Sequence, residues 1–127
     1  MSSKSELEFL PSSTPGMPFS EAVRVGNVLY LSGMLPLDAS RKVVEGGIVA
    51  QTRQVMDNIK AVLEKNGSSL DKVFKMTCML ADMSEWPEMN KVYVTYFSGQ
   101  FPARSAFGST GLAMGAKLEI EAVAVVE

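Results

Sequence analysis

Hydrophobic and polar positions alternate with two different periods along the chain, and the changes of period mark predicted strands and helices. Two β-rich runs, residues 22–25 and 28–32, flank a two-residue Gly-Asn turn and predict a hairpin. Over residues 47–66 the period is helical, and Gly67 is placed to end this helix. The apolar face of the predicted helix is formed by Ile48, Val55, Met56, Ile59, Val62 and Leu63.

Residues 73–97 predict another strand followed by a second helix. Residues 73–80 are largely apolar on both faces, as expected of a central strand. Ser84 can cap a helix over residues 85–97, and Gly99 follows its end. The apolar stripe of this helix is interpreted as core packing and not as a stacking platform. The stripe consists of Trp86, Met89, Tyr93, Tyr96 and Phe97.

The C-terminal part predicts two more strands around a Gly-rich loop. Residues 102–107 form the first strand, 108–115 the loop and 117–125 the last strand. Glu119 and Glu121 share one face of the last strand, whose other face is apolar. The loop does not match a phosphate-binding loop, because the Ser or Thr expected after its lysine is absent and a strand follows.

These elements predict one α+β domain over residues 1–127, with a single sheet of about six strands and two helices packed on one face. Residues 1–18 are rich in Ser and Pro and are expected to be a largely irregular leader. The second face of the sheet is partly apolar and needs cover. Because 46% of the residues are hydrophobic and only 20% are charged, oligomerisation is the natural source of that cover.

Composition narrows the classes of function. The net charge is −2 without a basic run, so no nucleic-acid partner is expected. Neither a membrane span nor a signal peptide is recognisable, so we expect no membrane partner and a cytoplasmic location. The absence of histidine removes Ser-His and Cys-His dyads and His-ligated zinc. The single cysteine, Cys78, is expected to be a buried, inert thiol.

The stretch Phe101-Pro-Ala-Arg-Ser105 and the strand after it supply candidate chemistry. Arg104 carries a planar guanidinium that can hold a carboxylate through two parallel hydrogen bonds. Glu119, at the head of the last strand, can hold a water molecule or move a proton nearby. Spacing alone also permits a plainer interpretation, in which Arg104 is a surface cation and Glu119 is half of a salt bridge.

Several short segments, in order and at matching spacing, resemble the RidA/YjgF family of enamine/imine deaminases from about Ser13 to Val126. The resemblance implies a chorismate-mutase-like α+β fold assembled as a homotrimer, with ligand clefts between adjacent subunits. The matching segments are Pro18-Phe19, Gly26-Asn27, Leu31-Ser-Gly33, Gln51-Thr-Arg-Gln54 with Asn58-Ile59, Asn90 with Tyr93, Phe101-Pro-Ala-Arg-Ser105 and Glu119-Ile-Glu-Ala122.

The activity implied by the resemblance is hydrolysis of reactive 2-enamine and 2-imine acids, of the 2-aminoacrylate and 2-iminopropionate type, to 2-keto acids and ammonia. Such intermediates leak from pyridoxal-phosphate enzymes acting on serine or threonine, so the reaction removes a reactive compound. An imine is already electrophilic, and the enzyme mainly positions substrate and water. No metal or organic cofactor is required.

The resemblance also implies a set of site residues. Arg104 would bind the substrate carboxylate, while a water held by Glu119 and backbone groups would attack C2. The remaining residues expected to line the cleft are Phe19, Ser32, Gly33, Asn90 and, through its backbone, Ala106.

The chain departs from the family pattern at three places. Phe19 stands where many members have tyrosine, so a phenolic hydrogen bond or proton donor is absent. Ala106 stands where many members have cysteine, so a thiol role is not carried over. Leu112-Ala113 replaces the usual Leu-Pro before the last strand, which can alter one wall of the cleft.

Three alternatives remain open from the sequence. The first is a non-enzymatic module that binds small carboxylates or acts as a chaperone-like trimer, which the nine methionines would suit. The second is a deaminase for another enamine acid, such as an aminomuconate-like compound, because Met17, Phe19, Met34 and the 108–115 loop would shape the cleft. The third, RNA cleavage as attached to some relatives, is disfavoured by the acidic balance and the missing histidines.

Overall fold

A computed structural model describes residues 6–126, in which six strands form one sheet and two α-helices pack against it. This confirms the predicted α+β class with two helices. Among these residues no helix combines the length and the apolarity needed to cross a bilayer. The elements are β1 (Leu7–Pro11), β2 (Ser20–Val25), β3 (Val28–Leu31), α1 (Gly47–Lys65), β4 (Val73–Leu80), α2 (Trp86–Tyr93), β5 (Ala103–Gly108) and β6 (Leu118–Val125).

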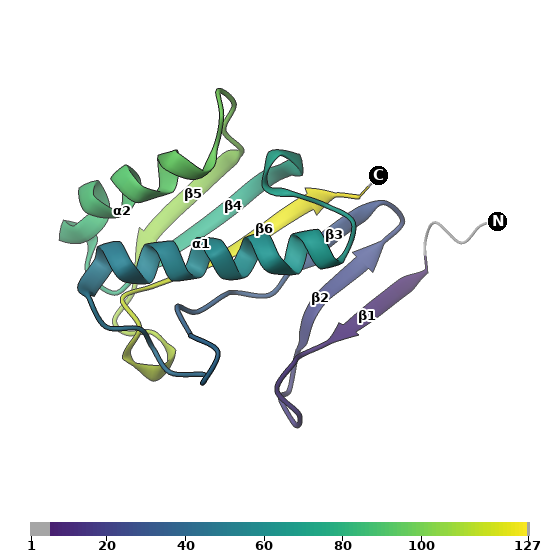
Figure 1. The fold of residues 1–127 in the computed structure, drawn as a ribbon, viewed down its shortest axis with the longest axis horizontal. Helices are drawn as coiled ribbons and strands as arrows, with labels where there is room; N and C mark the ends of the chain where they lie inside the picture. The colour runs from purple at the N-terminus through teal and green to yellow at the C-terminus, as the bar shows by residue number, and fades with distance from the viewer. Residues whose placement is uncertain (1–5, 127) are drawn as a thin grey trace.

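The order of strands across the sheet is β1-β2-β3-β6-β4-β5. The pair β4 and β5 is parallel, and all other neighbours are antiparallel. The last strand, β6, therefore lies between the N-terminal hairpin and the β4–β5 pair (Figure 1). This insertion places the Gly-rich segment before β6 close to the segment that follows β3, where Met34 and Ile120 form an isolated bridge.

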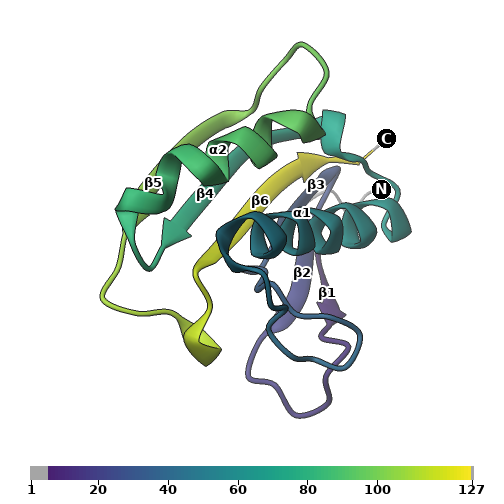
Figure 2. The ribbon, with the colours of Figure 1, turned by 60° about the vertical axis from the view of Figure 1, so that its left-hand side comes forward.

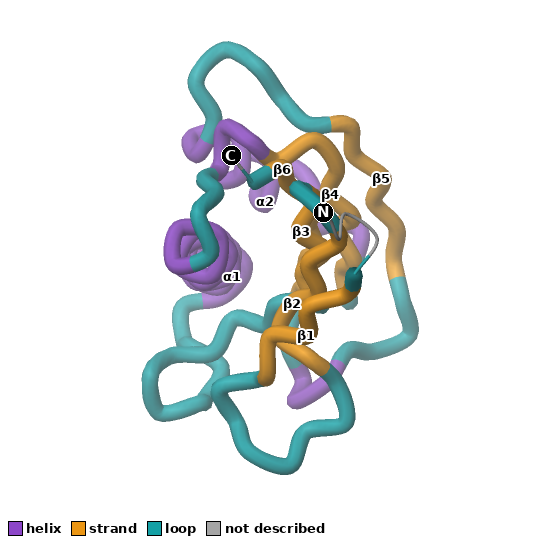
Figure 3. Tube along the Cα trace, turned by 90° about the vertical axis from the view of Figure 1, so that its right-hand side faces the viewer, coloured by secondary structure: helices purple, strands orange, loops and turns teal. Residues whose placement is uncertain are grey.

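Both helices cover the same face of the sheet, as Figure 2 shows, and the edge-on view in Figure 3 places α1 to one side of the strand layer. The core forms between this face and the helices. Four apolar residues of α1 have no exposed surface, and the facing residues of β6 are equally buried. Full burial of each Val, Leu, Ile or Met side chain contributes about 1.5–3 kcal/mol. These residues are Val55, Met56, Ile59 and Leu63 of α1, and Leu118, Ile120 and Ala124 of β6.

The second face of the sheet carries large apolar side chains without cover from this chain. Tyr30 of β3 is 50% exposed and pairs with Val23 of β2 and Val123 of β6. Toward the β1 edge, Phe9 is 63% exposed. An exposed apolar surface that runs across several strands is typical of an interaction face. The partly apolar second face predicted from the sequence is thus present.

Three local predictions need correction. The segment 1–18 is not wholly irregular, because it contains β1, which pairs with β2; an edge strand tolerates a proline such as Pro11 at its end. Residues 1–5 lie outside the described residues. The second helix ends at Tyr93 and continues only as a 3₁₀ turn, so it is shorter than residues 85–97. Ser84 is not the cap: it lies in a 3₁₀ turn, Met83–Glu85, that precedes α2, and Asp82 caps this turn by accepting a hydrogen bond from the Ser84 backbone N–H.

Candidate functional site

Arg104 lies on β5 in register with Met76, and therefore on the side of the sheet that faces the helices. Its Cζ atom lies 4.8 Å from the centre of the Trp86 ring and 4.7 Å from that of Tyr93. Its Nη1 donates a hydrogen bond of 2.8 Å to Asn90 Oδ1. These three partners recur at helical spacing along one face of α2. The helix thus holds the guanidinium in place through two cation–π contacts and one hydrogen bond.

Arg104 is held without a carboxylate partner. The ion pairs among residues 6–126 are Lys65–Glu21, Lys91–Glu88 and Lys117–Glu85. Neither Arg104 nor Glu119 takes part in them, and Arg104 is half-buried, so the plainer interpretation of these two residues is wrong within the described chain. A half-buried guanidinium that is fixed but unpaired can accept an anionic ligand at little cost in reorganisation.

The side chains around Arg104 are neutral at physiological pH. Burial raises the pKa of Cys78 to about 11, although Arg104 acts in the opposite direction. Cys78 is buried next to Ala106, which confirms the predicted inert thiol. Burial likewise raises the pKa of Tyr93 to about 12, and among the described residues its buried hydroxyl has no hydrogen-bond partner. Arg104 therefore keeps its charge beside two neutral side chains, Cys78 and Tyr93.

Glu119 lies on the opposite face of the sheet. It is in register with Met79 on β4, and its neighbours Leu118 and Ile120 are buried in the core on the helix side. Partial burial raises the pKa of Glu119, and the negative charge of Glu121 raises it further. A carboxylate with a raised pKa is a better proton acceptor than an exposed one.

Gly33 lies directly against the Glu119 carboxylate, so closely that a Cβ atom at this position would overlap with it. The chain before Gly33 is fixed by Ser32, whose hydroxyl donates a 2.6 Å hydrogen bond to the Ser20 carbonyl. The chain after it is fixed by Asn58 of α1, whose Nδ2 donates to the carbonyl groups of residues 35 and 37 at 3.1 and 3.0 Å. The backbone around Gly33 is thus a rigid support for Glu119.

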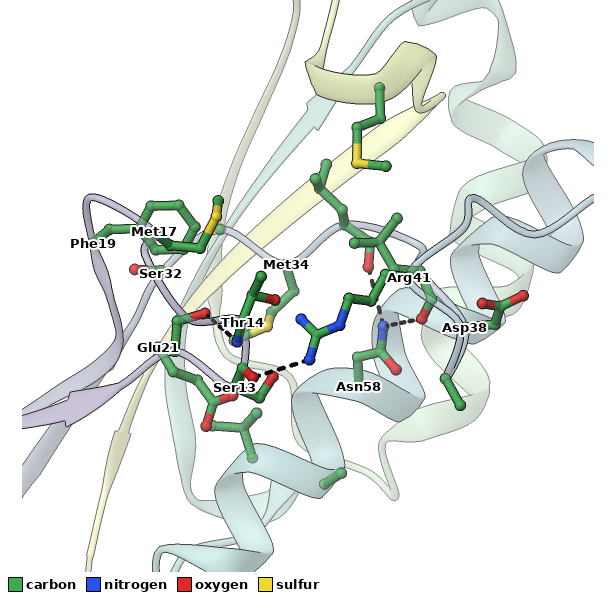
Figure 4. Close-up of a pocket in the computed structure, with 18 of the residues that line it drawn as sticks. Ser13, Thr14, Met17, Phe19, Glu21, Ser32, Met34, Asp38, Arg41 and Asn58 are labelled. Carbon is green, nitrogen blue, oxygen red and sulfur yellow. Dashed lines mark hydrogen bonds between the residues drawn. The ribbon is translucent and has the colours of Figure 1, made fainter.

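Phe19, Ser32 and Gly33 line a cavity of about 580 Å³ (Figure 4). Phe19 is 49% exposed and lies beside Met17 at one side of this cavity. Residues expected to line the cleft are therefore brought together here, and Glu119 joins them through Gly33. We call Phe19, Ser32, Gly33 and Glu119 the glutamate group.

Arg104, Asn90 and Ala106 form a second set, the arginine group, at the β5 edge of the sheet. The expectation that Glu119 lies near Arg104 is wrong within one chain, because the two side chains project from opposite faces and β4 separates their strands. Successive side chains of a strand point to opposite faces of the sheet. The sequence shows this alternation within each strand, but it does not show whether residues of two different strands share a face. Only groups from two different chains can therefore complete a site that contains both.

The sequence pattern does not reveal Trp86 and Tyr93 as partners of Arg104. It predicts core packing for both, and Tyr93 is indeed buried, but their ring faces also hold the guanidinium. The available signal was Asn90, which shares their helix face at a position where an apolar residue would be expected. Within residues 6–126 no group of three or more His, Cys, Asp or Glu side chains is placed to hold a metal ion.

Comparison with known proteins matches residues 11–126 to the family described as Endoribonuclease L-PSP. A RutC family protein from Pyrococcus horikoshii is 44% identical over 111 residues, which cover 87% of this chain and 88% of that protein. The mouse 2-iminobutanoate/2-iminopropanoate deaminase is 40% identical over 109 residues, which cover 85% of this chain and 81% of that enzyme.

The fold agrees with solved structures as well. The crystal structure of a Rid family protein, YyfA from Yersinia pestis, superposes with a TM-score of 0.88 at 36% identity, covering 95% of this chain and 100% of that one. The family match spans nearly the whole described chain and includes both the arginine group and the glutamate group. The chain therefore belongs to the RidA/YjgF family, as its sequence pattern indicates.

Proposed function

We propose that the protein hydrolyses 2-imino acids, formed from 2-enamine acids of the 2-aminoacrylate type, to 2-keto acids and ammonia. The observation that carries this proposal is the Arg104 guanidinium, held by Trp86, Asn90 and Tyr93 and lacking an ion-pair partner among residues 6–126. Such a cation suits the carboxylate that every substrate of this class carries. The name of the mouse relative describes the same chemistry.

The reaction needs a site that combines the two groups, and a homotrimer with clefts between subunits would supply it. Arg104 of one chain would then face Glu119 of its neighbour, which resolves their separation within a single chain. The uncovered apolar face with Tyr30 at its middle supports an assembly of this kind. That the protein is cytoplasmic stays a prediction from the sequence.

The steps follow from the groups available. Arg104 fixes the substrate carboxylate and orients C2 of the imine. Glu119 holds a water molecule and accepts its proton as the oxygen forms a bond to C2 and the C=N π electrons move onto the nitrogen, which then takes this proton from Glu119. The product of this addition carries a hydroxyl and an amino group on C2. When the C–N bond breaks, the hydroxyl proton passes to the nitrogen, which leaves as ammonia, and the oxygen becomes the keto oxygen. Phe19 and Ala106 add shape and a backbone contact, but neither supplies a proton.

The test couples in-situ generation of 2-aminoacrylate to detection of the keto acid. Wild-type protein should accelerate keto acid formation, and Arg104→Ala should lower kcat/KM by about 30-fold or more, since loss of a buried charge partner costs about 2–5 kcal/mol. Arg53→Ala, at an exposed position on α1, serves as the matched control. Wild-type turnover by Arg104→Ala would refute the proposal. Binding of 2-ketobutyrate in calorimetry without any turnover would favour a carboxylate-binding module instead.

A further inference from the structure

The cavity in Figure 4 extends from Phe19 to a second side, which is formed by Asp38 and Arg41. The cavity lies between α1, the segment before β2 and the segment after β3, at the edge of the sheet away from Arg104. Its volume of about 580 Å³ is within the range of small-molecule sites. Its wall is mostly apolar and rich in sulfur. The apolar residues that matter here are Met17, Phe19, Met34, Leu35, Val62 and Met114.

Four charged side chains also line the cavity, and three of them are already satisfied. Lys65 Nζ lies 2.8 Å from a carboxylate oxygen of Glu21, and the Asp38 carboxylate accepts hydrogen bonds of 2.8 and 3.1 Å from backbone N–H groups of its own turn. Arg41 differs: among residues 6–126 no carboxylate lies within ion-pair distance of it. Its Nη2 donates 2.9 Å to the Ser13 carbonyl, while a guanidinium has five N–H donors.

The backbone directs Arg41 toward this cavity. Arg41 adopts a left-handed conformation with φ 64°, which is uncommon for a residue with a side chain. The turn that imposes it is closed by backbone hydrogen bonds of 2.9 Å from Asp38 N to Lys42 O and from Arg41 N to Asp38 O. In Figure 4 the side chain reaches across the cavity toward Ser13, between the apolar wall and Asn58.

We propose that this cavity is a second ligand site, which binds a small monocarboxylate with an unbranched apolar body through Arg41. The carboxylate binds the free N–H groups of Arg41, and the apolar body lies against the methionine side chains, which adapt readily to ligand shape. The cavity shares Phe19, Ser32 and Gly33 with the glutamate group, but Figure 4 places Phe19 and Ser32 on the side opposite Arg41. The inference concerns binding alone and holds whether or not the protein is a deaminase.

The experiment compares hexanoate with hexanamide, its uncharged counterpart of equal size. The protein is labelled with ¹³C at the methionine methyl groups, and each ligand is titrated while methyl resonances are followed. Hexanoate should shift the resonances of Met17, Met34 and Met114, and it should bind at least tenfold more tightly than hexanamide. Met56 and Met76, which have no exposed surface, report that the fold is unchanged. Measurements on the wild-type protein alone can therefore overturn the proposal: equal affinity for both ligands would do so, and so would resonance shifts confined to other methionines.

Variants then locate the charge. Arg41→Gln should abolish the preference for hexanoate over hexanamide, and Arg41→Gly, which suits the left-handed turn, should do the same. Arg53→Gln removes an arginine from the exposed surface of α1 and should keep the preference. A preference that survives in Arg41→Gln, or that is lost equally in Arg53→Gln, would contradict carboxylate binding by Arg41.

Discussion

Gly33 and the Glu119 carboxylate are packed so closely that no other residue fits at position 33 while Glu119 keeps its place. Gly33 is not in the left-handed region, so its role is one of space and not of backbone conformation. The close approach fixes a carboxylate against a backbone segment that Ser32 and Asn58 hold from either side. This relationship makes the position of Glu119 sensitive to a single methyl group.

Gly33→Ala should therefore displace the Glu119 side chain and lower kcat for imine hydrolysis, while the loss of stability should be about 1 kcal/mol at most, because the nearest atoms are the end of a flexible side chain. Denaturation curves and the keto acid assay measure the two effects. Gly111→Ala is the control, because a Cβ atom at Gly111 meets no atom within 4 Å. In the double variant Gly33→Ala/Glu119→Ala the stability loss should be smaller than the sum of the single losses; additive losses would show that the two residues are not in conflict.

Glu119 should also make stability depend on pH. Its folded-state pKa is raised, mainly by burial and then by Glu121, above the usual value of 4.5. The folded protein thus binds a proton at pH values where the unfolded carboxyl has lost it, and stability falls as the pH rises from 4.5 through the raised pKa. Glu119→Gln should be more stable than wild type at pH 7, and this gain should shrink toward pH 4.5. Urea denaturation at several pH values measures it, with Glu64→Gln as the control for one lost charge. If the gain in stability of Glu119→Gln is the same at every pH, the raised pKa of Glu119 is not its cause.

Asn90 should act through Arg104. Asn90→Ala removes the acceptor for Arg104 Nη1 and frees the guanidinium to move. Loss of a hydrogen bond to a charged group is worth about 1.5–3 kcal/mol, so KM should rise tenfold or more with a smaller change in kcat. Asn90→Asp should be worse, because its carboxylate competes with that of the substrate for Arg104. Steady-state kinetics separate the two parameters, and Lys91→Ala on the same helix is the control. A milder effect of Asp than of Ala would mean that Arg104 does not bind a carboxylate.

The sequence predicts the fold well because its signals are local. The hairpin turn, the helical period over residues 47–66 and Gly67 at the helix end all correspond to the structure, with α1 ending at Lys65 and Gly67 at φ 81°. The site is harder to predict, because it depends on the faces to which separate strands direct their side chains. Nothing between Arg104 and Glu119 in sequence reveals that they project from opposite faces. The role of Arg41 is hard to predict for a related reason, because only the turn geometry directs its side chain into a cavity.

The separation of Arg104 from Glu119 leads to the last prediction, which concerns assembly. If adjacent chains complete the site, a charge placed on the uncovered face should abolish activity without unfolding the chain. Tyr30 lies at the middle of that face and is 50% exposed, so Tyr30→Glu should leave the fold of a single chain intact. Burial of the new carboxylate between chains would be costly, and the variant should therefore be monomeric.

Sedimentation equilibrium measures the assembly, circular dichroism the fold and the keto acid assay the activity of Tyr30→Glu. Val94→Glu is the matched control, because Val94 is 44% exposed but lies in the 3₁₀ turn after α2, on the helix side of the sheet. The control should keep the assembly state and the activity of the wild-type protein. Full activity from a folded, monomeric Tyr30→Glu would mean that one chain contains a complete site. The proposed pairing of Arg104 with a neighbouring Glu119 would then be wrong, because within one chain the two side chains project from opposite faces of the sheet.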